Sequence, residues 1–261
     1  MVESGDAGTS SGPPQAPTTL CIDVGGTGLK ASVVDAAGQM LTERARVAVE
    51  YPMSPSVLVD RLAALTRPLP DHERVSVGFP GIVRHGVVLT APHFVTVSGP
   101  GSAVDKSLLE QWTSFALAAA VTERFAKPAR VINDADLQGL DVMTGVGLEM
   151  VVTLGTGVGT CIVDNGVLGP HLELAHHRFR KGQTYDEQLG NAARKRIGNS
   201  EWNKRVTRAV AAFDALVLFD TLYVGGGNSR HVTVDLGPRV KLIDTNAGIR
   251  GGVKLWSQPE A

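Results

Sequence analysis

Apolar and polar positions near the beginning of the chain follow the pattern of short strands separated by tight turns. Two apolar runs cover residues 20–34 and flank the glycine turn GGTG at 25–28. A second turn at 35–38 and a third strand-like run at 40–49 come next. Because short apolar runs bounded by glycine-rich turns are typical of antiparallel strands, this region predicts a three-stranded meander.

Helical spacing begins after this meander. Residues 57–65 place apolar side chains on one helical face, and 74–79 form a short strand-like run closed by a Pro-Gly pair. A longer helix is predicted over 108–125, where strong helix formers share an apolar face and a Lys-Pro pair ends the pattern. Helices that separate strands indicate an α/β layer.

A second cycle of the same kind starts at the strand-like pair 131–132, which stops at Asn133. A helix is predicted over 135–144, and a strand, the glycine turn GTGVG and another strand follow over 149–164. This last unit echoes the one at 20–34 about 130 residues earlier. The echo predicts two similarly built lobes with a cleft between them. The remaining predicted elements are helices at 185–197 and 203–218, a strand at 219–224, a strand at 240–243 and a helix at 249–256.

Composition narrows the classes of protein that remain. The 261 residues include 25 Lys+Arg and 26 Asp+Glu, so no overall charge attracts nucleic acid or a membrane. The two cysteines, Cys21 and Cys161, are far apart in the sequence, which argues against a disulfide scaffold. Residues 1–17 lack the apolar segment of a secretion signal, and no apolar run is long enough for a membrane helix. We therefore expect a cytoplasmic protein with a disordered N-terminal tail.

Three glycine-rich turns follow predicted strands. Glycine lets the backbone approach a ligand closely and aim successive N–H groups at an anion, so such turns can cradle phosphates. None of them matches the Walker pattern or a Rossmann fingerprint. Asp23 lies two residues before the first turn and Thr27 lies within it, and Mg²⁺ needs few protein ligands. Any one of these turns alone is more typical of a structural tight turn, but the three together indicate binding of a phosphate donor with Mg²⁺.

Several short motifs occur in an order that is similar to the ROK family of sugar kinases. They are DVGGTGLK at 23–30, GFPG at 78–81, Asn133-Asp134, LGTGVG at 154–159, ELAH at 173–176 and Gly225-Gly226-Gly227. The segments 172–190 and 194–206 resemble the polyphosphate glucokinase branch. This resemblance implies an α/β, two-lobed actin/hexokinase-like (ribonuclease H-like) fold with the active site in the cleft. The expected units are a tail at 1–17, a small lobe at 18–132, a large lobe at 133–247 and a C-terminal helix at 248–261 that returns to the small lobe.

The resemblance also implies roles for single residues. Asp134 would be the general base that takes the proton of the sugar hydroxyl, and a carboxylate at a strand's carboxyl end faces the ligand crevice of an α/β layer. The sugar hydroxyls would be held by Asn133, Glu173, His176 and, with weaker support, Glu187. From the residues alone, Asp134 could instead be a helix N-cap and His176 a structural histidine. Asp136 is left outside the predicted site as a cap or supporting acid. The predicted phosphate-binding residues are Gly25, Gly26, Thr27, Lys30, Gly155, Thr156, Gly157, Gly226 and Gly227. Asp23 is the predicted ligand of Mg²⁺.

The phosphate donor is suggested by how the charges are distributed. Residues 178–208 hold nine basic and three acidic side chains, a balance of +6, while the rest of the chain has a balance of −7. Such a run can be an ordinary solvated face or a groove for a long polyanion. Nucleic acid is not expected, because neither an aromatic-interleaved platform nor a motif for a base-reading helix accompanies the charges. Together with the resemblance, this favours transfer of a phosphoryl group from polyphosphate to the 6-hydroxyl of glucose, with ATP as an alternative donor.

The loop 90–101 departs from the branch pattern, with Pro92 and His93 where the branch has alanine and asparagine, so mannose or another hexose is an alternative substrate. The cysteines that bind zinc in most ROK kinases have no counterpart after Cys161, and no zinc is expected. A non-catalytic sugar sensor is the alternative from another class. A homodimer is expected from the resemblance.

Overall fold

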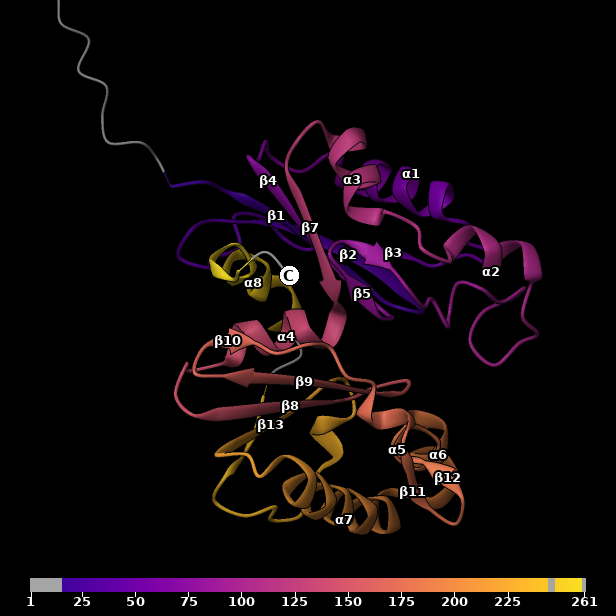
Figure 1. Cartoon of the computed structure of the whole chain (residues 1–261), viewed down its shortest axis with the longest axis vertical. Coiled ribbons are helices and arrows are strands. Elements are labelled where there is room, and N and C mark those ends of the chain that lie inside the picture. Colours follow the sequence, from indigo (N-terminus) through magenta and orange to yellow (C-terminus); the bar gives the residue numbers. More distant parts are fainter. Residues whose placement is uncertain (1–15, 244–246, 260–261) are drawn as a thin grey trace, which may run out of the picture.

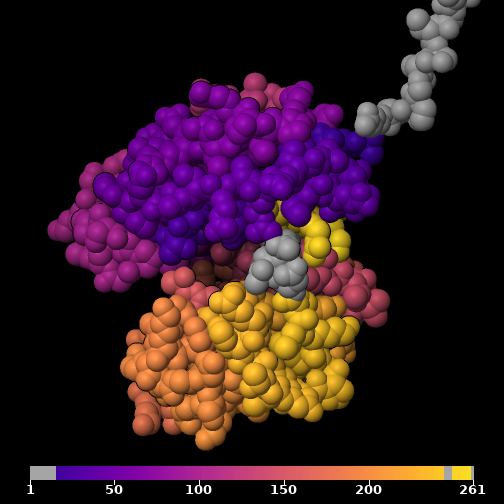
Figure 2. Space-filling view, turned by 180° about the vertical axis from the view of Figure 1, so that it is seen from behind, coloured from indigo at the N-terminus to yellow at the C-terminus, as the bar shows by residue number. Residues whose placement is uncertain are grey.

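The computed structural model describes residues 16–243 and 247–259 and contains two five-stranded sheets, one in each of two lobes (Figures 1 and 2). The strand orders are β3-β2-β1-β4-β7 and β10-β9-β8-β13-β14. Most of the tail predicted over 1–17 lies outside the described residues. Within the described part of the chain, no helix is both long and apolar enough to cross a membrane.

The first sheet combines a meander with two parallel strands. Strands β1 (Thr19–Val24), β2 (Gly28–Val34) and β3 (Ala45–Ala48) pair antiparallel, and β4 (Arg74–Phe79) and β7 (Ala129–Asn133) extend the sheet parallel to β1. The carboxyl ends of β1, β4 and β7 therefore share one edge, which is where ligands bind in open α/β sheets. Helices α1 (Pro55–Thr66), α2 (Lys106–Trp112) and α3 (Leu117–Phe125) contribute to the core on one face of this sheet, and the hairpin of β5 (Val83–Arg84) and β6 (Val87–Val88) packs there too.

The second sheet repeats the plan. Strands β8 (Leu148–Leu154), β9 (Val158–Asp164) and β10 (Val167–Leu168) form its meander, and β13 (Thr221–Gly225) and β14 (Val240–Leu242) add to it in parallel. One face packs on α5 (Tyr185–Leu189) and α7 (Asn199–Val217), with α6 (Asn191–Ile197) between them in the chain. A hairpin of β11 (Arg178–Arg180) and β12 (Gln183–Thr184) lies beside α5.

Two helices lie between the sheets, α4 (Asp134–Val142) and α8 (Ala247–Lys254) (Figure 1). Strand alternation accounts for this layering, because Leu20 and Ile22 face the outer core while Cys21 points inward to α8. Glycine permits the close contact: a Cβ on Gly252 would lie 2.5 Å from Cys21 Sγ, and one on Gly251 would overlap the Leu137 carbonyl oxygen. The C-terminal helix thus packs on the first sheet and crosses α4.

Two predicted helices are each divided in the structure. The helix predicted over 108–125 is α2 and α3, separated where Ser114 adopts a positive φ of 58°. Trp112 is buried there with its indole N–H donating to the Met53 carbonyl at 2.9 Å, and Phe115 forms a bridge with Val88. These tertiary contacts override local helix propensity.

The helix predicted over 185–197 is divided at Gly190. The peptide N–H of Asn191 donates to the carbonyls of Gly155 and Thr156, which ties the break to the second glycine turn. The helix predicted from Asn203 starts earlier, at Asn199, because Gly198 with φ 78° turns the chain before it. The strand-like run at 40–49 forms a strand at 45–48 and a single bridge at Met40.

Candidate active site

The cleft between the lobes has a volume of about 1110 Å³, and all three glycine turns line it. Figure 2 shows the hollow between the lobes from behind. The first two turns are closed alike, with Gly25 N–H donating to the Gly28 carbonyl at 3.0 Å and Gly155 N–H to the Gly157 carbonyl at 2.9 Å. Gly226 has φ 82°, and a Cβ there would lie 2.5 Å from the Leu154 carbonyl oxygen. The structure brings together every predicted phosphate-binding residue: Gly25, Gly26, Thr27, Lys30, Gly155, Thr156, Gly157, Gly226 and Gly227.

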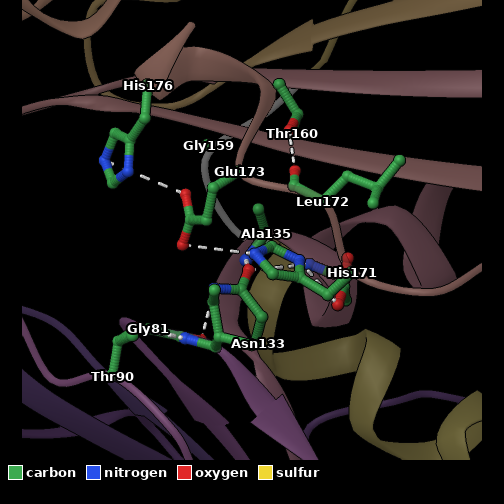
Figure 3. Close-up of polar contacts among 12 residues, drawn as sticks. Gly81, Thr90, Asn133, Ala135, Gly159, Thr160, His171, Leu172, Glu173 and His176 are labelled. Carbon is green, nitrogen blue, oxygen red and sulfur yellow. Dashed lines mark hydrogen bonds and ion pairs between the residues drawn. The ribbon is translucent and has the colours of Figure 1, made fainter.

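Asn133 ends β7 and caps α4. Its side-chain oxygen accepts from Ala135 N–H at 2.7 Å and from Asp136 N–H at 3.3 Å, while its amide donates to the Gly81 carbonyl at 3.0 Å (Figure 3). The N-cap is therefore Asn133 and not Asp134, which answers the alternative reading of Asp134. Asn133 lines the cleft, but its oxygen and one amide hydrogen are already used within the protein, leaving a single N–H for a ligand.

Asp134 is the first residue of α4 and its carboxyl group opens into the cleft. Burial raises its pKa to about 7, with the negative charge of Asp23 as the next cause. The Ala135 N–H, which donates to Asp134 Oδ1 at 3.0 Å, acts against this rise. A carboxyl group whose pKa lies near neutral pH is suited to accept a proton in a transition state and return it afterwards.

Asp23 and Lys30 face each other across the β1–β2 pair. Lys30 Nζ lies 2.9 Å from Asp23 Oδ2, and the Asp23 side chain is 15% exposed. The second carboxylate oxygen of Asp23 has no hydrogen-bond partner among the described residues, and its charge is close enough to raise the pKa of Asp134. This donor set suits a Mg²⁺ ion that arrives with donor phosphates and keeps most of its waters.

Glu173 also lines the cleft, in the segment after β10 that leads into a 3₁₀ turn at Leu174–His176. Its side chain is 23% exposed and contacts His171 and His176 (Figure 3). The His176 side chain is 58% exposed, with Nε2 4.0 Å from Glu173 Oε2, so it is free to turn toward a ligand. Burial raises the pKa of Glu173, but the neighbouring His171 outweighs this and holds that pKa below its usual range.

The structure does not place Glu187 with the other predicted residues. Its carboxylate accepts from Thr184 N–H at 2.8 Å while Thr184 Oγ1 accepts from Glu187 N–H at 3.1 Å, a reciprocal cap at the start of α5. The acid that reaches the cleft is its neighbour Asp186, which accepts from Val158 N–H at 2.7 Å in the second glycine turn. In this arrangement Glu187 caps α5 and stands apart from the cleft lining, and its role as a sugar ligand stays a prediction.

Sequence reasoning missed several residues that line or support the cleft. His171 is buried between acids, and its position two residues before Glu173 in PHLE was the available signal. His93, in the loop that departs from the branch pattern, lies against Gly26, where a Cβ would be 3.0 Å from its ring. Burial lowers the pKa of His93, which keeps the ring neutral near pH 7.

The basic side chains at the cleft come from segments other than the one singled out. Arg44 and Arg46, Lys30 and Arg230 line it, the first three from the small lobe and the last from the large lobe. In the described part of the chain, which includes all of 178–208, none of the nine basic residues of that stretch lines the cleft. One of the nine, Arg194, is linked to the cleft through a hydrogen bond: its Nε donates to the Asn228 side-chain oxygen, beside the third glycine turn, at 3.2 Å.

Comparisons with known proteins identify the family of this chain. The model of the ROK family matches residues 19–181. The chain belongs to the ROK family. This ROK protein is 30% identical over 218 residues to a polyphosphate glucokinase from Mycobacterium tuberculosis (strain CDC 1551 / Oshkosh), covering 80% of this chain and 77% of the relative.

Solved structures agree with this membership. An inorganic polyphosphate/ATP-glucomannokinase from Arthrobacter sp. strain KM superposes with a TM-score of 0.77 at 31% identity, covering 93% of this chain and 99% of that one. A ROK family glucokinase from Streptomyces griseus, in complex with glucose and AMPPNP, has a TM-score of 0.71 at 20% identity and covers 91% and 98%, which shows a shared fold. The predicted family, polyphosphate glucokinase branch and actin/hexokinase-like fold are confirmed, and the chain is a sugar kinase.

Proposed function

We propose that this ROK sugar kinase transfers a phosphoryl group from polyphosphate, and also from ATP, to the 6-hydroxyl of glucose. The observation that carries the proposal is Asp134, a cleft carboxyl with a pKa of about 7 opposite three glycine turns. Similarity to a polyphosphate glucokinase and to a polyphosphate/ATP-glucomannokinase supports the choice of donors and sugar.

In the proposed reaction the sugar occupies the side of the cleft that carries Glu173 and His176. Their acceptor and donor groups bind its hydroxyls, together with the remaining amide hydrogen of Asn133. Asp134 accepts the proton of the 6-hydroxyl as that oxygen forms a bond to the terminal phosphorus. The bond from that phosphorus to the bridging oxygen of the donor breaks, and the donor leaves one phosphate shorter.

Positioning and charge neutralisation supply most of the catalysis in phosphoryl transfer. The backbone N–H groups of the glycine turns cradle donor phosphates, and Lys30 contributes a cation from the small lobe. Asp23 would hold Mg²⁺ on its free carboxylate oxygen. When bound, the ion neutralises charge on the donor phosphates.

Polyphosphate as the donor is supported by the four basic side chains of the cleft. Arg44, Arg46 and Lys30 stand on one lobe and Arg230 on the other, so the terminal phosphates of a chain can be met from both sides. Arg194, which belongs to the basic stretch 178–208, lies beside the third glycine turn, so a polyphosphate chain could leave the cleft there and follow that stretch over the large lobe. In this arrangement the cleft cations hold the reacting end, and the basic stretch contacts the rest of the polymer.

A matrix of initial rates tests the proposal, with ATP and purified polyphosphate as donors, glucose and mannose as sugars, and Mg²⁺ present or absent. We expect glucose 6-phosphate from polyphosphate in the presence of Mg²⁺. Product from ATP but none from polyphosphate removes the donor assignment, and a higher kcat/KM for mannose removes the sugar assignment. Asp134→Asn is the inactive reference, and Asp60→Asn, which alters an exposed acid far from the cleft, is its control.

Mannose is included because a specific feature of this chain favours testing it. His93 projects from the loop 90–101 to the first glycine turn, and Glu173 and Asp186 both act on its pKa. His93 therefore lies near both a proposed phosphate-binding turn and the proposed sugar ligand Glu173. A relative that uses this fold is a glucomannokinase by name.

A further inference from the structure

A buried histidine links the helix that carries the proposed base to the segment that carries a proposed sugar ligand. His171 Nδ1 lies 3.0 Å from Asp136 Oδ2, and His171 Nε2 lies 3.4 Å from Glu173 Oε1. The side chains of His171 and Asp136 are each 4% exposed. Asp136 stands two residues after Asp134 on α4, and Glu173 faces the cleft (Figure 3).

The geometry favours a positive charge on this histidine. Both ring nitrogens face carboxylate oxygens, and a neutral imidazole would turn the lone pair of one nitrogen toward an anion. The doubly protonated ring avoids that repulsion, since it presents an N–H to each acid. Ionising the buried Asp136 and the half-buried Glu173 together would be costly without a cation between them. Although burial lowers the pKa of His171, Asp136 and Glu173 raise it to about 10, in agreement with this assignment.

The segment around His171 is held firmly enough for such a role. Gly169 N–H donates to the Ile162 carbonyl at 2.9 Å, and Thr160 Oγ1 donates to the Leu172 carbonyl at 2.7 Å, so both flanks of His171 are attached to β9. On the other side, Asn133 caps α4 and sets the direction of its first turn. The ion pairs of His171 therefore connect two anchored backbones and set the distance between Asp134 and Glu173.

We propose that His171 is a positioning residue, which as an imidazolium bound to Asp136 keeps Glu173 ionised and directed into the cleft as an acceptor for sugar hydroxyls. This inference rests on the proposed function in one respect, that Glu173 binds the sugar. It assigns a purpose to Asp136, which has no other cation nearby among the described residues. It also separates the two acids of α4, since Asp134 takes the proton and Asp136 supports the binding site.

Sugar binding in the absence of any donor provides the first test. We expect His171→Leu to weaken the Kd for glucose about tenfold or more at pH 8, because the ion-pair partner of Glu173 is lost. KM for the sugar should rise in parallel, while KM for the donor stays within about twofold, since the donor binds elsewhere in the cleft. His171→Gln, which can still donate to Glu173, should recover part of the loss. His177→Leu, an exposed neighbour outside the cleft, is the matched control.

The pH dependence of the same binding separates positioning from packing. Glu173 faces His171, His176 and His93, and Asp136 faces His171, the Cys161 thiol and Asp134. Because Asp134 itself titrates near pH 7, both measurements are made in an Asp134→Asn background, where the His171 cation keeps Glu173 ionised and glucose affinity should change little as pH falls from 8 to 5.5. In His171→Leu, burial raises the pKa of Glu173 unopposed by His171, and affinity should fall further over this range. Unchanged affinity and unchanged pH dependence in His171→Leu would overturn the proposal.

Nitrogen-15 NMR of histidine in the wild-type protein gives a measurement that does not depend on sugar or on folding of a variant. Both ring nitrogens of His171 should remain protonated from pH 6 to pH 8.5, and Glu173→Gln should lower the pKa of His171. A neutral His171 ring in this range overturns the proposal. If the wild type binds no hexose, the proposed function fails, while the NMR result still decides whether His171 pairs with Glu173.

Discussion

Replacing the proposed base should make the enzyme inactive and more stable at the same time. Asp134 has to ionise in a site where burial and Asp23 raise its pKa from 3.8 to about 7. Asn at this position keeps a side-chain oxygen for the Ala135 N–H, which lies 3.0 Å from Asp134 Oδ1. Asp134→Asn therefore preserves the local geometry of α4 while removing both the proton acceptor and the buried charge.

The size of the effect on stability follows from the two pKa values. A raised carboxyl pKa in the folded state stabilises the fold fully below pH 3.8, and this contribution is lost as pH rises through about 7. Because each pKa unit corresponds to about 1.4 kcal/mol, the wild type loses at most about 4 kcal/mol between pH 3.8 and pH 8. The cleft admits solvent, so this is an upper bound. Because Asn does not ionise, the free energy of unfolding of Asp134→Asn should not fall in this way as pH rises.

Urea denaturation of both proteins at pH 5 and pH 8 checks the calculation. The variant should gain stability relative to the wild type by up to about 2–3 kcal/mol between these pH values. Its turnover should fall about 10²–10⁴-fold, the usual contribution of a general base, while glucose still binds. The rise of wild-type turnover through pH 7 should be absent. Turnover of Asp134→Asn within tenfold of the wild type would refute the assignment. So would a difference in unfolding free energy between Asp134→Asn and the wild type that is the same at pH 5 and pH 8. Asp60→Asn is the control for both measurements.

Three further predictions concern other parts of the molecule. Gly251→Ala should lower the free energy of unfolding by about 3 kcal/mol, because the new Cβ overlaps the Leu137 carbonyl where α8 crosses α4. Thermal unfolding should show the corresponding decrease in Tm. Glu187→Gln should cost at most about 1 kcal/mol in urea denaturation and leave KM for glucose unchanged, whereas Glu173→Gln should raise that KM. KM for long polyphosphate should rise steeply with salt concentration, because binding a polyanion releases counterions, whereas KM for glucose should not change. Initial rates measured from about 50 to about 300 mM salt would show this difference.

Much of the architecture was accessible from the sequence because it depends on local patterns. The echo of strand, glycine turn and strand at 20–34 and 149–164 corresponds to the two meanders that begin the two sheets. The abrupt stop at Asn133 marked the carboxyl end of a parallel strand, where the cleft opens. These features follow from alternation and turn chemistry, so they do not depend on distant contacts.

The errors arose where a tertiary contact decides between two local options. Ser114 interrupts a good helix pattern because Trp112 and Phe115 are held by Met53 and Val88 from elsewhere in the lobe. Adjacent acids at 186 and 187 have the same local character, and only the position of the second glycine turn sends one to the cleft and the other to a cap. His171 was missed for the same reason, since its partner Asp136 is on another element.

The placement of α8 has a consequence for how the protein is made. Ser76 of the first sheet donates to the carbonyl of Gly252, a residue 176 positions later, at 2.7 Å. At ordinary rates of synthesis, roughly 10–35 seconds pass on the ribosome between these two residues. Until α8 arrives, the inner face of the first sheet around Cys21 has no cover from it. The first lobe to leave the ribosome is therefore among the last to be completed, and the hydroxyl of Ser76 lacks its Gly252 partner during that interval.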